Sequence, residues 1–308
     1  MIKKALIYTV LWLIKQKSLW DEKHQKSLDV HFFRKVIKYT NKLTRLFQPI
    51  RSDITIVESS LGELSCFYLS FSKKTTQNIL YLHGGGYILG LKGSTDKIYQ
   101  SFCAELAAVS QANVWLVEYD VAPESALKQI IKKTYSAYLA LLDKGVKASD
   151  TTLMGDSAGG GLALLLLMKL RDDNVVLPKG AILLSPWTDL AVNSDSMITR
   201  ASKDPILTPF KIAQAATLVR GTCHATDPKI SPLYGHFKGL PPLMFILGEH
   251  EILYDDAFDA AEKARQAGVL VNFDVQDGLF HVYPLFYGFI KEAKEAILRM
   301  ASFIKSTA

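Results

Sequence analysis

Short apolar runs recur along the chain, and most are separated by stretches with helical spacing. Eight runs are predicted strands: ITIVES (54–59), LSCFYLS (64–70), NILYLHG (78–84), NVWLVEY (113–119), TTLMG (151–155), AILLSP (181–186), LMFILG (243–248) and VNFDVQ (271–276). The later runs are continuously apolar, which is typical of strands covered on both faces. Helices are predicted at about 97–110, 125–145, 158–172, 254–268 and 286–305. Because strands and helices alternate from the third run onward, we expect an α/β fold with an eight-stranded, mostly parallel sheet flanked by helices.

Two segments do not follow this alternation. In residues 1–50, an apolar N-terminal stretch is followed by a predicted amphipathic helix at 32–47. Residues 190–238 have mixed polarity, several prolines and no clear strand. We expect these two segments to fold together as a helical cap over a core formed by residues 51–189 and 239–308.

The N-terminus, MIKK-ALIYTVLWLI-KQK, has ten successive uncharged residues between basic flanks. Ten residues are too few to span a bilayer, which needs about 20. A helix that is apolar on all sides must be buried or lie in a membrane surface. We therefore expect a cap helix over the protein's own binding site. Peripheral membrane contact through residues 1–18 and a cleaved signal peptide are the alternatives, although no small-residue cleavage motif follows.

Composition and charge narrow the function classes. The 308 residues are 49% hydrophobic and 21% charged, an ordinary globular composition. The net charge of +6 is uneven, because the first fifty residues hold eleven Lys and Arg against three Asp and Glu, while the remainder sums to −2. The body of the chain has no basic stripe with interleaved aromatics, so nucleic-acid binding is not expected. Three scattered cysteines without ligand spacing fit reduced thiols in a cytoplasmic protein and predict no metal site.

The stretch LMGDSAGGG (153–161) joins an apolar strand to a predicted helix. Its core, GDSAG (155–159), is a G-x-S-x-G motif, in which a sharp strand-to-helix turn exposes the serine and small residues let the backbones pass. The N-terminus of the following helix favours developing negative charge. Ser157 is therefore the predicted nucleophile, and a glycine-rich helix entry without chemistry is the alternative.

A serine hydroxyl needs a general base before it can attack a carbonyl carbon. His281 follows the last predicted strand, where a loop can hold its imidazole over the sheet edge, whereas most other histidines fall in the presumed cap. The base needs an acid, which we expect after the strand LMFILG. Glu251 is the favoured acid and Glu249 its main rival, while Asp255 and Asp256 fall where a helix begins and suit capping.

The stretch HGGGY (83–87) follows the apolar run NILYL, although glycines cost backbone entropy on folding. The tetrahedral intermediate of acyl transfer needs backbone N–H donors aimed at its oxyanion. A side chain at these positions would block that approach. Gly85 and Gly86 are therefore predicted donors, together with Ala158 after the nucleophile. A flexible glycine turn without chemistry is the alternative.

The motifs HGGGY and GDSAGG resemble those of the hormone-sensitive-lipase-like esterases, a bacterial group within the α/β-hydrolases. The order Ser157, Glu251, His281 is also the α/β-hydrolase order of nucleophile, acid and histidine. Further matches are Tyr119-x-x-Ala122-Pro123-Glu124, Ser185-Pro186-Trp187 and Gly278-x-x-His281. The resemblance covers about residues 75–290. It implies an α/β-hydrolase fold with an N-terminal helical cap, no metal or organic cofactor, and hydrolysis of small-molecule esters with short to medium acyl chains.

The resemblance also implies roles for single residues. It carries the roles of nucleophile, base and oxyanion donor over to Ser157, His281, Gly85, Gly86 and Ala158. His83 and Gly84 are implied to support the oxyanion loop. Tyr87 and Trp187 are expected to line the substrate pocket, and Asp156 to make a structural contact beside the nucleophile.

The chain departs from the family pattern at several places. Glu251 stands where the family usually has aspartate, and Asp120-Val121 stands where it often has Arg-Leu. The proline-rich stretch usual after the Ala-Pro-Glu tripeptide is missing. A glutamate is longer by one methylene but can hold the same hydrogen bond, so we expect activity.

Several functions and one assembly stay open at this stage. An amidase, a peptidase or a lipase could use the same triad, and a non-catalytic small-molecule receptor could use the same scaffold. Family members often pair through the last strand and helix. A homodimer formed through residues 271–305 is therefore an expectation by analogy.

Overall fold

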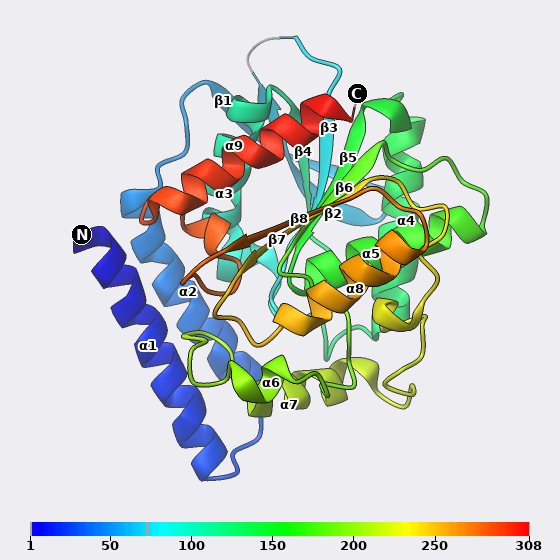
Figure 1. The fold of residues 1–308 in the computed structure, drawn as a ribbon. Coiled ribbons are helices and arrows are strands. Elements are labelled where there is room, and N and C mark those ends of the chain that lie inside the picture. The colour runs from blue at the N-terminus through cyan, green and yellow to red at the C-terminus, as the bar shows by residue number, and fades with distance from the viewer. Residues whose placement is uncertain (1, 72–73, 308) are drawn as a thin grey trace.

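The computed structural model describes residues 2–71 and 74–307. These residues contain an eight-stranded sheet in the order β1-β2-β4-β3-β5-β6-β7-β8 (Figure 1). The strands are β1 (Ile54–Leu61), β2 (Leu64–Phe71), β3 (Asn78–Leu82), β4 (Asn113–Val117), β5 (Thr151–Asp156), β6 (Gly180–Leu184), β7 (Leu243–Gly248) and β8 (Val271–Gln276). The pairs β1–β2 and β2–β4 are antiparallel, and the later pairs are parallel. The prediction of an eight-stranded, mostly parallel sheet is confirmed. Residues 1 and 308, the outer limits of the expected cap and core ranges, lie outside the described residues.

Helices cover both faces of the sheet (Figure 1). One face carries α3 (Asp96–Ser110) and α9 (Lys291–Ser306), and the other carries α4 (Leu127–Asp143), α5 (Ala158–Asp172) and α8 (Tyr254–Gln266). Alternate residues of each inner strand enter the two cores, because side chains of a strand point to opposite faces. In β7, for example, Phe245 packs in one core and Met244 and Ile246 in the other.

The last helix begins later than the sequence predicts. We expected it from residue 286, but α9 starts at Lys291. The segment Tyr283–Phe286 instead forms the 3-10 helix η4, with Pro284 in its first turn. Proline suits the first turn of a helix but interrupts a longer one, so the aromatic run YPLF becomes a separate turn. The other short helices are η1 (Leu91–Thr95), η2 (Ala148–Asp150) and η3 (Pro232–Tyr234).

The two segments outside the alternation lie on one side of the molecule (Figure 1). They contain α1 (Ile2–Lys23), α2 (Val30–Phe47), α6 (Ser196–Thr199) and α7 (Pro209–Arg220). The Nζ of Lys15 in α1 donates to the carbonyls of Ala201, Asp204 and Leu207 at 2.8, 2.6 and 2.9 Å. These bonds join the N-terminal helix to the loop between α6 and α7. Within the described residues, no helix combines the length and the apolar character needed to cross a membrane.

The carboxyl ends of β3, β5, β6 and β7 meet at one edge of the sheet because these strands run parallel. The register places Leu82 of β3 opposite Gly155 of β5, and Asp156 opposite Leu184 of β6. The glycine loop after β3 and the sharp turn after β5 therefore emerge side by side. In open parallel sheets this edge is where ligands bind.

Candidate active site

Ser157 has a backbone conformation that few non-glycine residues adopt, with φ 52° and ψ −120°, at the turn from β5 into α5. Its N–H donates to the Leu184 carbonyl at 2.8 Å, and its carbonyl accepts from the Gly161 N–H at 3.1 Å. A Cβ added at Gly155 or Gly159 would lie 2.2 or 2.1 Å from a backbone carbonyl oxygen, so glycine is needed at both positions. Local strain of this kind persists only where the surroundings impose it, and it often marks a functional residue.

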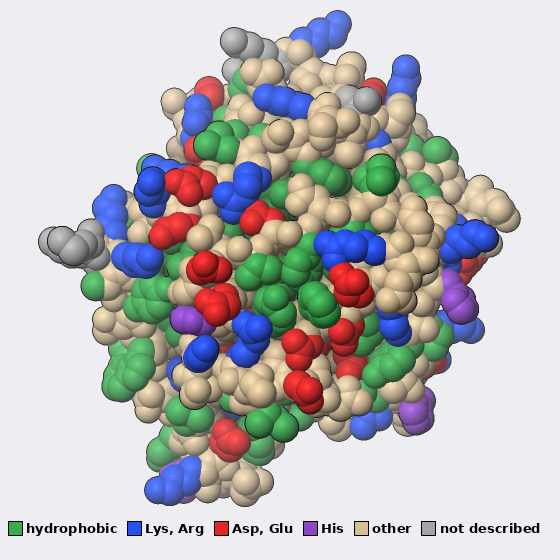
Figure 2. All heavy atoms as spheres, viewed as in Figure 1, with side chains coloured by type: hydrophobic (Ala, Val, Ile, Leu, Met, Phe, Trp, Pro, Cys, Tyr) green, Lys and Arg blue, Asp and Glu red, His purple; other side chains and the backbone are tan. Residues whose placement is uncertain are grey.

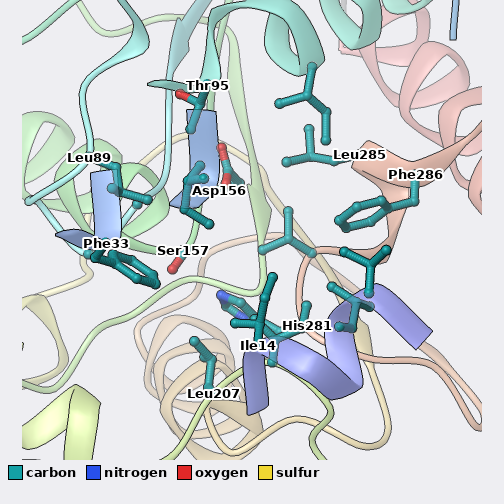
Figure 3. A pocket seen from close by; sticks show the side chains of 18 of the residues that line it. Ile14, Phe33, Leu89, Thr95, Asp156, Ser157, Leu207, His281, Leu285 and Phe286 are labelled. Atoms are coloured by element: carbon teal, nitrogen blue, oxygen red, sulfur yellow. The ribbon is translucent and has the colours of Figure 1, made fainter. Parts of the chain in front are cut away.

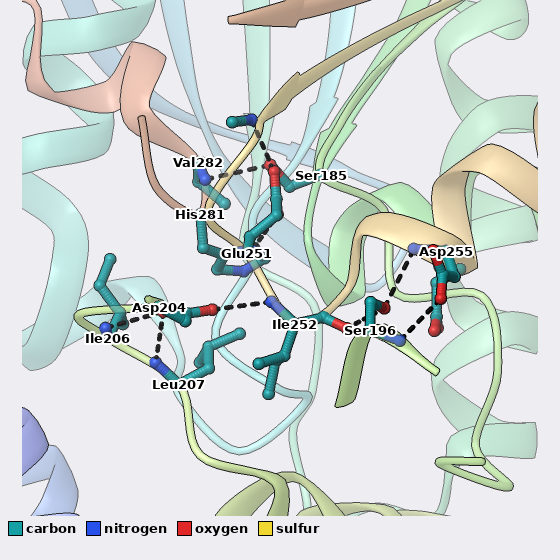
Figure 4. Close-up of polar contacts among 12 residues, drawn as sticks. Ser185, Ser196, Asp204, Ile206, Leu207, Glu251, Ile252, Asp255, His281 and Val282 are labelled. Atoms are coloured by element: carbon teal, nitrogen blue, oxygen red, sulfur yellow. Dashed lines mark hydrogen bonds and ion pairs between the residues drawn. The ribbon is translucent and has the colours of Figure 1, made fainter. Parts of the chain in front are cut away.

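His281 is paired with Glu251 beneath the cap (Figure 4). The His281 Nδ1 lies 2.7 Å from Oε2 of Glu251, a side chain that is 0% exposed. The other carboxylate oxygen, Oε1, accepts from the Gly248 N–H at 2.7 Å and from the Ser185 hydroxyl at 2.9 Å. Because an ionised carboxylate only accepts hydrogen bonds, Nδ1 carries the proton and Nε2 is left as an acceptor. The pair thus sets the imidazole tautomer that a general base requires.

Opposing effects act on the His281 imidazole. Burial lowers its pKa and is the largest single effect, but the hydrogen bond and negative charge of Glu251, together with the charges of Asp204 and Asp156, raise the pKa more. The net result is a pKa above the ordinary value for histidine. The site therefore stabilises the imidazolium that forms when a general base accepts a proton.

The acidic residues near Glu251 make other contacts. Glu249 is exposed, and its carboxylate accepts a backbone N–H from the loop before His281, which lowers its pKa. Asp255 and Asp256 lie in the first turn of α8 and accept backbone N–H groups from the segment that follows β6. Of the four candidates, Glu251 is the one that the structure places against His281.

The glycine loop after β3 lies next to the serine. Gly85 and Gly86 have φ values of 110° and 62°, and both line the same cavity as Ser157 and His281. Figure 3 shows the Ser157 and His281 side chains at this cavity. A Cβ added at Gly85 would lie 2.6 Å from the Leu89 Cβ, so the loop requires glycine on steric grounds as well. Ala158 is the first residue of α5, directly after the serine.

The Asp156 carboxylate holds the glycine loop after β3 through hydrogen bonds. It accepts from the Gly84 N–H at 2.9 Å and from the hydroxyls of Tyr81 and Tyr99 at 3.0 and 2.8 Å. Burial raises the pKa of Asp156 to about 6, although these hydrogen bonds favour its charged form. The carboxylate thus makes a structural contact beside Ser157, as the sequence suggested.

Replacing Asp156 with alanine should loosen the loop. The hydroxyls of Tyr81 and Tyr99 would lose a buried acceptor, whereas the Gly84 N–H would keep the Tyr99 hydroxyl oxygen as its partner, so we expect the free energy of unfolding to fall by about 2–5 kcal/mol. Tyr81→Phe is the matched control, because it removes one donor together with its need for a partner and should cost only about 1 kcal/mol. Urea unfolding of both variants measures the difference, and equal losses would contradict an anchoring role for Asp156.

His83 lies in the protein interior rather than in the cavity. Its Nδ1 is 2.7 Å from the Gly84 carbonyl, and its ring stacks on Tyr119 with centroids 4.0 Å apart. Burial lowers its pKa to about 4, so the ring is neutral and Nδ1 donates. The Tyr119 hydroxyl donates to the His83 carbonyl. These contacts hold the start of the glycine loop.

The cavity beside Ser157 has a volume of about 290 Å³ and is lined mainly by apolar side chains from α1, α2, α3, α7 and the loops at the sheet edge. Tyr87 and Trp187, expected from the sequence to line it, are not among its lining residues. Both are 1% exposed and lie in the core with their ring centroids 6.1 Å apart. The left-handed backbone of Tyr87, φ 58°, accompanies this inward placement. Neither ring therefore lines this cavity, in contrast to the expectation from the sequence.

Two side chains that support the acid were not predicted from the sequence. Ser185, directly after β6, donates to Glu251 and accepts from the Val282 N–H at 3.1 Å. Asp204 accepts from the N–H of Ile252, the residue after Glu251, at 3.0 Å (Figure 4). The sequence could have indicated Ser185, because a polar residue that follows a buried parallel strand lies at the edge of the sheet where ligands bind. No sequence feature indicated Asp204, since it lies in an irregular loop 47 residues before Glu251.

Comparison with known proteins identifies the fold family and its relatives. A family model described as alpha/beta hydrolase fold matches residues 79–285. The chain is 32% identical to an esterase of Acinetobacter venetianus over 268 residues, which is 86% of each protein. It is also 32% identical to an acetyl-hydrolase of Streptomyces hygroscopicus, over 80% of this chain and 81% of that protein.

A solved structure gives the same result for the fold. The crystal structure of an esterase from the bacterial hormone-sensitive lipase family superposes with a TM-score of 0.89 at 28% identity. The match covers 100% of this chain and 98% of the other, so it includes the cap segments as well as the sheet.

Proposed function

The chain belongs to the hormone-sensitive-lipase-like group of the alpha/beta hydrolase fold family and is an ester hydrolase; we propose that it is a serine carboxylesterase for short to medium acyl chains. The observation that carries the proposal is the buried His281–Glu251 pair, whose histidine lines the same apolar cavity as Ser157. Nucleophile, base and orienting acid follow the roles known for acyl transfer.

In the proposed acylation step, the Ser157 Oγ attacks the ester carbonyl carbon and its proton passes to Nε2 of His281. The carbonyl oxygen becomes an oxyanion, which the N–H groups of Gly85, Gly86 and Ala158 would bind. Collapse of this intermediate breaks the bond to the alcohol oxygen, which takes the proton from Nε2. The products are the free alcohol and an acyl ester on Ser157.

Deacylation repeats these steps with water. His281 Nε2 takes a proton from a water molecule as that water attacks the acyl-enzyme carbonyl. The second oxyanion collapses, the bond to the Ser157 Oγ breaks, and the serine recovers its proton from Nε2. Glu251 stays ionised throughout, and its charge stabilises each imidazolium.

The cavity supports a limit on acyl-chain length. Its volume of about 290 Å³ is roughly twice that of an engineered apolar cavity that holds benzene. An apolar lining favours an alkyl chain over a charged acyl group. Turnover of p-nitrophenyl acetate, butyrate, octanoate and palmitate tests the proposal, with low activity expected on palmitate. Binding of these esters without turnover would contradict it.

Filling the cavity from α1 should shift the preferred chain length. Ile14 lines the cavity (Figure 3), whereas the side chain of its neighbour Leu13 is 56% exposed. We expect Ile14→Trp to lower the octanoate-to-acetate ratio of kcat/KM by about tenfold or more, because added bulk excludes several methylenes. Leu13→Trp is the matched control and should leave the ratio unchanged. If both variants behave alike, α1 does not bound the acyl site.

A further inference from the structure

The outer face of α1 is unusually apolar for a surface helix. Its exposed large side chains are Leu6 (39%), Trp12 (55%), Leu13 (56%), Leu19 (41%) and Trp20 (48%). Positions 6, 13 and 20 are seven apart, as are 12 and 19, so they form two neighbouring stripes along the helix. Single exposed apolar residues are normal, but a contiguous patch marks an interaction surface.

The inner face of the same helix is already occupied. Ile7 and Leu11 are each 4% exposed, and Val10 and Ile14 line the cavity beside Ser157. Lys15 is held in the protein by its three carbonyl contacts. The orientation of α1 is therefore fixed by the fold, and the patch faces outward as a consequence.

Basic residues surround the patch. Lys3, Lys17, Lys23 and Lys26 are exposed, and Figure 2 shows basic side chains beside hydrophobic ones along α1. The Nζ of Lys17 lies 5.1 Å and that of Lys26 5.6 Å from the Trp20 ring centroid. The first fifty residues carry a net charge of +8, whereas the rest of the chain sums to −2. The positive charge is thus concentrated in the N-terminal segment that includes α1.

We propose that the outer face of α1 docks the protein onto an anionic lipid surface. Tryptophan and leucine on one face, with lysines beside them, are the features of a helix that lies in the membrane interface. Each lysine close to an anionic surface adds about 1 kcal/mol of attraction. This helix lies on the surface and does not span it.

Docking would bring the lipid surface close to the acyl cavity. The outer face of α1 contacts the lipid, and the inner face of the same helix lines the cavity that holds Ser157. A lipophilic ester dissolved in the membrane is the substrate class that this arrangement suits. That part of the inference rests on the proposed esterase function, whereas docking itself does not.

Vesicle binding tests the proposal. Wild type and Ser157→Ala should both sediment with vesicles of phosphatidylcholine containing phosphatidylglycerol. Both should bind only weakly to vesicles of phosphatidylcholine alone, and high salt should weaken their binding to the anionic vesicles. Trp115 and Trp187 are buried, so a blue shift of tryptophan emission on binding would report on Trp12 and Trp20. Because the serine variant lacks the proposed nucleophile, failure of docking and failure of the esterase proposal are separate results.

A pair of double variants locates the surface. Trp12→Ser with Leu13→Ser should weaken vesicle binding by about tenfold or more and leave hydrolysis of dispersed p-nitrophenyl acetate unchanged. Val176→Ser with Leu270→Ser removes apolar residues that are 59% and 75% exposed elsewhere and should bind as wild type does.

Three results would overturn the proposal. The first is equal binding to neutral and anionic vesicles, and the second is equal loss in the two double variants. The third is a dimer in solution that the Trp12 and Leu13 changes convert to a monomer, because the patch would then be an interface between two copies of the chain.

Discussion

Ser157→Ala is expected to abolish ester hydrolysis, lowering kcat by about 10⁴-fold or more. Alanine retains the Cβ that already accommodates the strained backbone at φ 52°, so the turn between β5 and α5 should keep its geometry. The change removes only the hydroxyl oxygen that would bond to the acyl carbon. Residual activity would come from the oxyanion donors and substrate binding alone. Turnover of p-nitrophenyl butyrate by the purified variant measures the loss.

Ser185→Ala is the control for that result. Ser185 also follows a central strand, but its hydroxyl contacts Glu251 and Val282. Losing one hydrogen bond to a buried carboxylate should cost about 1.5–3 kcal/mol. If the transition state loses this full free energy, kcat should fall by roughly ten- to a hundredfold. A Ser157→Ala enzyme that retains as much activity as Ser185→Ala would exclude Ser157 as the nucleophile.

The sheet and the motif positions could be predicted because the signals are local. Each strand is a short apolar run, and GDSAG must turn sharply between a strand and a helix. Parallel pairing then brings His83, Ser157 and Glu251 to one edge, since each follows a strand of the same sheet. The differences from the sequence expectation are also local. Pro284 divides the aromatic run before α9, and the rings of Tyr87 and Trp187 lie in the core.

The contacts of Lys15 and Asp204 with the loops around the acid could not be predicted, because they depend on tertiary packing. The Lys15 ammonium reaches carbonyls almost 190 residues away, and burial lowers its pKa. Asp204 fixes Ile252 through an irregular loop. Neither contact leaves a periodic or spacing signal. Through them the N-terminal helix holds the loop that presents Glu251, so the cap and the proposed triad are mechanically linked.

Glu251→Gln should lower kcat by about 10³–10⁴-fold through the tautomer of His281. The Gly248 N–H donates to one carboxylate oxygen at 2.7 Å, so the amide oxygen of the variant must take that position. Its NH2 group then faces Nδ1 of His281 and makes that nitrogen the acceptor. The imidazole proton moves to Nε2, which can no longer accept the proton of Ser157.

The pH profile separates this mechanism from a loss of folding. In the wild type, kcat/KM should fall as the pH drops through the raised pKa of His281, because only the neutral imidazole is a base. The variant lacks the charge that raised this pKa, while burial still lowers it, so the acid limb of its residual activity should move to lower pH. Glu249→Gln is the matched control and should change neither kcat nor the acid limb. If Glu249→Gln abolishes activity instead, or if the acid limb of Glu251→Gln stays in place, Glu251 is not the residue that orients the base.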